Sequence, residues 1–303
     1  MPEKKETAIN LSSLDFYKEF GPFTFPGAYQ SDLAKLPTSV QKIGSIVRMQ
    51  LIPVAIWEMG NTKSNLNQQY GDMDKVPWYR QREDDNFPTA AAMLAELYRR
   101  DSRGLVLDRE EKNCLVVSCR FTALLMAAIL KSQGIPTRVR SGFAPYFEGH
   151  EGKNVDHWIN EYWDETLRKW VLVDADVALE PYFKLDPFNL PRDSYYLPAD
   201  VWVGVREERI DSQEFWSQAG YGGLSAISEA LFYDFACLNN YEPVYAHYPA
   251  KFHGRFHQLF SGEWTEIDTL AGLMQFPDDN FAKLRGLWET SRAFRLLKGG
   301  LIR

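Results

Sequence analysis

The segment from Cys119 to Gln133 constrains the fold more than any other part of the chain. Residues 123–130 at its centre are apolar without a break, and a helix that has no polar face is buried on most sides. Gly134 follows at the position where helices commonly end, and Pro136 lies just beyond it. The sequence therefore predicts a central buried helix over 119–133, with Cys119 in its first turn and Ser118 as its cap.

Three strands are expected after this helix, over 137–143, 157–163 and 170–177, because apolar and polar residues alternate there. The link over 164–169 is short and polar, which indicates an antiparallel hairpin that turns near Thr166. The helix and the hairpin together predict an α+β fold in which the central helix packs against an antiparallel sheet.

The hairpin brings His157, at the start of one strand, beside the end of the next strand. His157 is then opposite or diagonal to Asp174 or Asp176, and sequence geometry leaves both aspartates open. The N–H groups at the start of a helix favour an anion, so Cys119 is well placed to act as a thiolate. A thiol, an imidazole and a carboxylate are the groups that cysteine acyl transfer requires, although each of them alone is more often structural.

This stretch resembles the transglutaminase-like superfamily of papain-related cysteine enzymes. The resemblance is carried by Cys119-Arg120-Phe121, Gly134-Ile135-Pro136-Thr137-Arg138, Ser141-Gly142-Phe143, His157-x-x-x-Glu161 and Trp170-Val171-x-Val173-Asp174. It implies a papain-like core with helical additions before and after it. It further implies a nucleophile at Cys119, a general base at His157 and an orienting carboxylate at Asp174, which it favours over Asp176.

Two positions depart from the family pattern. Phe121 stands where family members often have an acidic residue, and Ile159 stands where they tend to have Trp. Both departures bear on the walls of the substrate cleft and leave the three proposed catalytic residues unchanged.

The resemblance and the composition of the flanking segments divide the chain into three parts. Residues 1–88 are expected to form an arm and helices packed on the core, 89–198 the catalytic core, and 199–303 a mainly helical subdomain. Thr89 is the expected cap of a helix that runs to Arg100.

Two arginines of the first predicted strand, Arg138 and Arg140, share a face. An acidic ligand could meet them there, but ion pairs at the surface are the expected arrangement.

Charge and cysteine content limit the partners. The 303 residues carry a formal net charge of −7, which argues against nucleic acid or an anionic membrane as a partner. Three cysteines are too few for a disulfide framework and fit a reducing compartment. The charged residues 1–6 have no apolar run behind them, and the apolar run over 123–130 is too short to span a bilayer. We therefore expect a cytoplasmic protein.

No cofactor or metal is expected. His253 and His257 are four residues apart and could share a metal on a helix, but Gly254 between them and the lack of a further ligand at suitable spacing disfavour such a site.

The leading functional hypothesis is an enzyme that acts on an amide or peptide bond through a thioester on Cys119. The substrate would be a peptide, a protein or a small amide, and hydrolysis is favoured over transfer to an amine. The alternative is a non-catalytic binding or scaffold protein on the same fold. Retention of all three reactive side chains argues against this alternative. The oligomeric state is left open.

Overall fold

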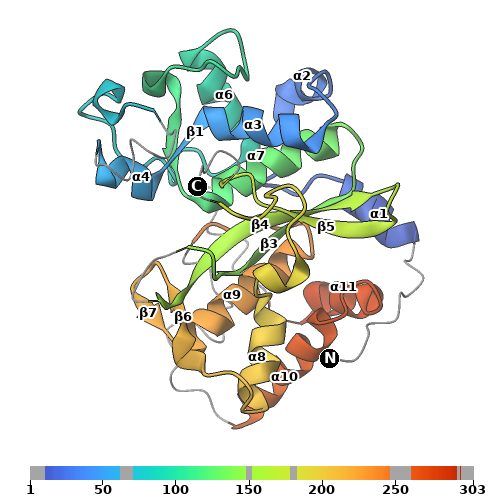
Figure 1. The fold of residues 1–303 in the computed structure, drawn as a ribbon. Coiled ribbons are helices and arrows are strands. Elements are labelled where there is room, and N and C mark those ends of the chain that lie inside the picture. Colours follow the sequence, from blue (N-terminus) through green and yellow to red (C-terminus); the bar gives the residue numbers. More distant parts are fainter. Residues whose placement is uncertain are drawn as a thin grey trace. The chain divides into compact units, whose positions relative to one another are not determined.

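The computed structural model describes residues 11–61, 71–147, 152–177, 183–245, 261–291 and 294. The chain divides into two compact units, and two of the four boundaries between them fall inside strands β3 (Thr137–Ala144) and β4 (Asn154–Asp164). The site unit comprises residues 20–140 and 157–194, and the second unit comprises 1–19, 141–156 and 195–303. Figure 1 shows the helices and strands of both units.

The site unit is built from short helices around one long buried helix. Its helices are α2 (Gln30–Leu33), α3 (Val40–Gln50), α4 (Val54–Met59), α6 (Ala90–Arg100) and α7 (Cys119–Ser132), and its 3-10 turns are η1 (Gly27–Tyr29), η2 (Met73–Lys75), η3 (Glu111–Asn113) and η5 (Arg192–Ser194). Its remaining strands are β1 (Leu51–Pro53), β2 (Leu115–Val117) and β5 (Lys169–Val173). Strands β1 and β2 pair in parallel, and β4 pairs with β5 in the antiparallel sense.

Helix α7 is the centre of the site unit, as the sequence predicts. Every residue from Arg120 to Lys131 is buried, and α2, α3 and α6 pack against the helix. Gly134 follows it with a φ of +75°, a conformation that glycine adopts without steric cost. The prediction of a buried helix that begins at Cys119 and is closed by Gly134 is confirmed.

The β4–β5 hairpin covers α7 on the side away from α3 (Figure 1). The amide group of Asn160 in β4 donates to the carbonyl oxygen of Ala123 at 3.0 Å. Val173, which is paired with Asn160 across the hairpin, belongs to the same apolar cluster as the core residues of α7. The predicted α+β class and the predicted antiparallel hairpin are therefore confirmed.

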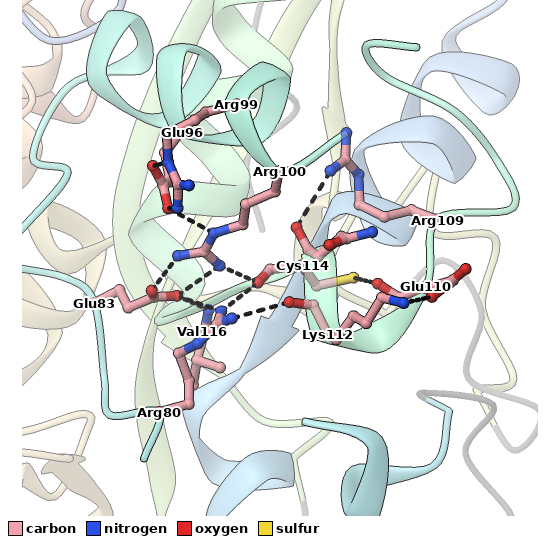
Figure 2. A network of polar contacts seen from close by, with 11 residues as sticks. Arg80, Glu83, Glu96, Arg99, Arg100, Arg109, Glu110, Lys112, Cys114 and Val116 are labelled. Carbon is pink, nitrogen blue, oxygen red and sulfur yellow. Dashed lines mark hydrogen bonds and ion pairs between the residues drawn. The ribbon is translucent and has the colours of Figure 1, made fainter. Parts of the chain in front are cut away.

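A buried polar network fixes the chain that leads into α7 (Figure 2). The carboxylate of Glu83 accepts the N–H of Val116 at 2.8 Å, and the N–H of Glu83 donates to the Val116 carbonyl at 2.9 Å. The same carboxylate pairs with Arg100 of α6 and, at 3.4 Å, with Arg80. Burying a carboxylate without such partners is strongly destabilising. The network thereby ties α6 to β2, two residues before Cys119.

The two expected helix caps behave differently. The hydroxyl of Thr89 accepts the N–H of Ala92 at 3.2 Å, so this predicted cap is confirmed. Ser118 occupies the cap position of α7, but its side chain makes no capping bond. Its hydroxyl donates to Asp84 at 2.9 Å instead, so the prediction that Ser118 caps α7 is wrong.

Arg138 and Arg140 form the predicted ion pairs, but not at the surface. Both are 1% exposed, and both face Glu161 of β4, Arg140 at 2.5 Å and Arg138 at 3.6 Å. Arg192 pairs with the same carboxylate, and Arg138 also lies over the ring of Trp170 at 3.8 Å. The surface location is wrong because strand alternation identifies a face without revealing what covers it.

The charge of these arginines determines the ionisation of Glu161. Burial alone would raise the pKa of this carboxyl, but Arg140, Arg192 and Arg138 outweigh burial and hold the pKa well below its usual range. Glu161 is therefore a buried carboxylate.

The second unit is mainly helical and carries a small sheet. Its elements are α1 (Leu11–Lys18), α8 (Pro198–Arg206), η6 (Ser212–Glu214), β6 (Phe215–Ser217), β7 (Tyr221–Gly222), α9 (Leu224–Cys237), α10 (Ser261–Met274) and α11 (Phe281–Thr290). Helix α8 packs against α9 and α10, and β6 pairs in parallel with the first residues of β4. The sheet is therefore mixed rather than purely antiparallel. The three-part domain division stays a prediction.

In the part of the chain that the structure describes, no helix combines the length and the apolar character that crossing a membrane requires.

Candidate active site

Cys119 is the first residue of α7 and is partly exposed. The buried strand β2 ends at Val117, and Ser118 has extended backbone angles (φ −81°, ψ 171°) before the chain turns into the helix. The thiol therefore lies in a first turn, where backbone N–H groups have no acceptor within the helix and favour an anion. Cys114 and Cys237, in contrast, are buried.

His157 in β4 is 1% exposed and contacts both of the other predicted site residues. Its Nε2 lies 2.9 Å from Oδ2 of Asp174, and the imidazole is also hydrogen-bonded to the side chain of Cys119. Since Nε2 faces Asp174, Nδ1 is the ring nitrogen that serves Cys119. The structure thus brings together Cys119, His157 and Asp174.

The hairpin register accounts for the contact between His157 and Asp174. Asn160 is opposite Val173, so the same register carried one residue further puts Ile159 opposite Asp174 and His157 diagonal to it. Asp174 is the first residue after β5, and its N–H donates to the carbonyl of Pro187 at 2.8 Å.

Asp176 lies in the same group of contacts and bonds to α7. Its carboxylate accepts the hydroxyl of Thr122 at 3.1 Å, and its N–H donates to Oδ1 of Asp174 at 3.0 Å. Burial raises the pKa of Asp176; the charge of Asp174 raises it further and that of His157 lowers it. Asp176 thereby connects the segment that carries Asp174 to the helix that carries Cys119.

The charges around His157 favour the imidazolium. Burial alone would lower the pKa of His157, but the negative charges of Asp174 and Cys119 and the hydrogen bonds to both residues outweigh burial. The pKa of His157 is consequently held well above its ordinary value. Chemically, the arrangement offers a thiol, an imidazole that can take and return a proton, and a carboxylate that fixes the orientation of the imidazole.

Three further residues of this neighbourhood are not marked by any local pattern in the sequence. Glu83 and Asp84 lie in the polar segment before α6, and Thr122 is one of many residues in a buried helix. Only their contacts with Val116, Ser118 and Asp176 single them out.

The predicted absence of a metal stays a prediction. His253 and His257 lie outside the described residues. Within the described ranges, no group of three or more His, Cys, Asp or Glu side chains is arranged to hold a metal ion.

Comparisons with known proteins bear on the same segment. The family model of the transglutaminase-like superfamily matches residues 113–175, which include Cys119, His157 and Asp174. No curated protein matches the chain.

Among solved structures, the chain is similar to a protein from Cytophaga hutchinsonii described as a "putative cysteine protease". The identity is 14%, the TM-score is 0.30, and the match covers 62% of this chain and 46% of that one. The chain thus matches less than half the length of that protein. Residues 113–175 of the chain are therefore similar to the transglutaminase-like superfamily.

Proposed function

We propose that the protein is a cysteine-dependent acyl-transfer enzyme that cleaves an amide or peptide bond through a thioester on Cys119. The observation that carries this proposal is the position of His157 between two partners. The His157 imidazole is hydrogen-bonded to Asp174 at 2.9 Å and to the side chain of Cys119, a residue that is partly exposed.

In the first half of the proposed reaction, the Cys119 thiolate attacks the carbonyl carbon of the substrate and forms a C–S bond. The electron pair of the C=O bond moves to the oxygen, and N–H groups of the first turn of α7 stabilise this oxyanion. The C=O bond then re-forms and the C–N bond breaks. The amine leaves with the proton that His157 donates.

In the second half, neutral His157 takes a proton from water, and the hydroxide attacks the thioester carbonyl. Collapse of this intermediate breaks the C–S bond and releases the acid and the thiolate. Asp174 holds the imidazole through Nε2 during both halves, so that Nδ1 stays directed at Cys119 and at the water.

The substrate class we propose is a peptide, a protein or a small amide. We favour hydrolysis over transfer to an amine because water needs no second binding site. The net charge of −7 supports a partner that is neither nucleic acid nor an anionic membrane. The small number of cysteines supports a cytoplasmic location.

Acylation by p-nitrophenyl acetate tests the proposal. Peptide mapping of the folded protein after brief exposure should find the acetyl group on Cys119, with Cys114 and Cys237 as internal references. His157→Ala should slow this acylation by about 100-fold or more. Deacylation with and without an added primary amine then separates hydrolysis from amine transfer.

The same experiment tests the alternative, which is a non-catalytic binding or scaffold protein. Acetylation of Cys119 no faster than that of the two buried cysteines, with no effect of His157→Ala, would overturn the catalytic proposal.

A further inference from the structure

Ser118, the residue immediately before Cys119, is held by a buried carboxylate. Oδ1 of Asp84 accepts both the N–H and the hydroxyl of Ser118, each at 2.9 Å. Asp84 is 5% exposed, and its Oδ2 pairs with Arg82. One oxygen of one side chain thus binds both donors of the residue that precedes the thiol.

Glu83 binds Val116, which lies two residues before Ser118. Its carboxylate accepts the N–H of Val116, and its own N–H donates to the Val116 carbonyl. Arg100 of α6 and Arg80 bind the same carboxylate (Figure 2). Residues 83 and 84, which we name the Glu83–Asp84 clamp, therefore bind the end of β2 and the start of α7 together.

The clamp also determines what the Ser118 hydroxyl does. A serine at a helix cap ordinarily accepts an N–H of the first turn. Here Asp84 takes the hydroxyl, and Ser118 contributes only its carbonyl, which accepts the N–H of Phe121 at 3.0 Å. The hydroxyl is thereby kept from competing with a thiolate or an oxyanion for the N–H groups of the first turn.

We propose that Asp84 is a positioning residue for Cys119, acting through Ser118. By binding both donors of Ser118, it fixes the backbone angles at which the chain enters α7 and so the direction of the thiol relative to His157. This inference rests on the proposed function, because the effect is on acyl transfer by Cys119.

Two substitutions at Asp84 separate hydrogen bonding from charge. Because both bonds to Ser118 use Oδ1, Asp84→Asn can keep them while it removes the charge and the pair with Arg82. Asp84→Ala removes the bonds and the charge together. Ser118→Ala removes only the hydroxyl bond and serves if Asp84→Ala does not fold. Asp85→Asn, at the exposed neighbouring residue, is the matched control.

The experiment measures the first-order rate and the apparent KM of Cys119 acetylation by p-nitrophenyl acetate, per folded molecule, with the folded fraction taken from circular dichroism. Misplacement of the thiol should lower the rate by about 10- to 100-fold in Asp84→Ala, with little change in KM. Ser118→Ala should lower it by less, Asp84→Asn should restore most of the rate, and Asp85→Asn should match the wild type.

Each other outcome has one meaning. A wild-type rate in folded Asp84→Ala, or in folded Ser118→Ala where Asp84→Ala does not fold, overturns the positioning role. An equal loss in Asp84→Asn and Asp84→Ala also overturns it, because the charge and not the bonds to Ser118 would then matter. Failure of the wild-type protein to acetylate at Cys119 counts against the proposed function. In that case, alkylation of Cys119 by iodoacetamide still reports whether Asp84→Ala and Asp85→Asn differ.

Discussion

Thr122 donates its hydroxyl to Oδ1 of Asp176 across 3.1 Å. Thr122 lies one turn after Cys119 in α7, and Asp176 lies two residues after Asp174. The N–H of Asp176 continues the connection to Oδ1 of Asp174 at 3.0 Å. The helix of the proposed nucleophile is therefore tied directly to the segment of the proposed orienting carboxylate, independently of His157.

Thr122→Val tests this tie, because valine keeps the shape of threonine and loses the hydroxyl. We expect the free energy of unfolding to fall by about 1–2 kcal/mol and the acetylation of Cys119 to slow. Urea unfolding and the p-nitrophenyl acetate assay measure the two effects. The control is Thr269→Val, at an exposed helical threonine of α10 whose hydroxyl bonds to the Thr265 carbonyl. Equal stability losses in the two variants would contradict the tie.

Asp174→Asn should abolish most acylation, whereas Asp176→Asn should have a smaller effect. Asp174 uses one oxygen for His157 and the other for the Asp176 N–H, and an asparagine has a single oxygen for these two donors. We expect a loss of about 100-fold or more for Asp174→Asn and less than about tenfold for Asp176→Asn, measured as single-turnover acetylation of Cys119. The reverse order would make Asp176 the orienting carboxylate.

The raised pKa of His157 makes its contribution to stability depend on pH. A group whose pKa is higher in the folded than in the unfolded state stabilises the fold fully below the unfolded value, which is about 6.5 for histidine. This contribution is lost as the pH rises through the folded-state pKa. The difference in free energy of unfolding between the wild type and His157→Gln should therefore be largest near pH 6 and shrink toward pH 9, by urea unfolding. A difference that grows with pH would show that the imidazole is neutral in the folded protein.

Because the Cys114 thiol is buried, we expect the free energy of unfolding to fall at alkaline pH. Burial raises the pKa of this thiol to about 12, and its Sγ lies 3.4 Å from the Met49 carbonyl oxygen. The unfolded chain releases this proton from about pH 8.5, so the folded state loses about 1.4 kcal/mol per pH unit above that value. Unfolding curves of Cys114→Ala at about pH 8 and pH 10 should lack this slope, whereas those of Cys237→Ala should retain the Cys114 contribution. A wild-type slope in Cys114→Ala would count against a neutral buried thiol.

Glu161 and Arg192 should differ strongly in their effect on stability. Glu161→Gln leaves Arg138 and Arg140 buried without their carboxylate, so we expect a loss of about 3–5 kcal/mol. Arg192 is 52% exposed, and Arg192→Ala should cost less than about 1 kcal/mol. Urea unfolding of both variants measures this contrast. Similar losses would mean that the pair with Arg192 carries as much of the stability as the buried pairs do.

Local signals in the sequence were enough to predict the framework of the site. The unbroken apolar run over 123–130 predicts burial, Gly134 marks where α7 ends, and the short polar link predicts the hairpin. These features are decided by residues close to one another in the chain. Sequence geometry left Asp174 and Asp176 open because a hairpin with unknown register fixes a neighbourhood and not a partner; the family pattern favoured Asp174.

Contacts between distant segments could not be predicted. Nothing local distinguishes Asp84 from the exposed Asp85, since their difference is the bond to Ser118 across 34 positions. The same holds for Arg138 and Arg140, whose burial depends on Glu161 and on the covering segments. The prediction that Ser118 caps α7 was wrong for the same reason: its hydroxyl donates to Asp84, which belongs to a distant segment.

The Glu83–Asp84 clamp limits how far the chain can be truncated from its N-terminal side without loss of contacts at the start of α7. A fragment that begins at residue 113 would contain Cys119, His157 and Asp174 yet lack both carboxylates that bind Val116 and Ser118. In the intact chain, these contacts close loops of 33 and 34 positions, which folding must complete before the contacts contribute. The matched segment is therefore smaller than the unit that folds. The backbone before α7 reaches its native contacts only when residues 83 and 84 have packed against residues 116 and 118.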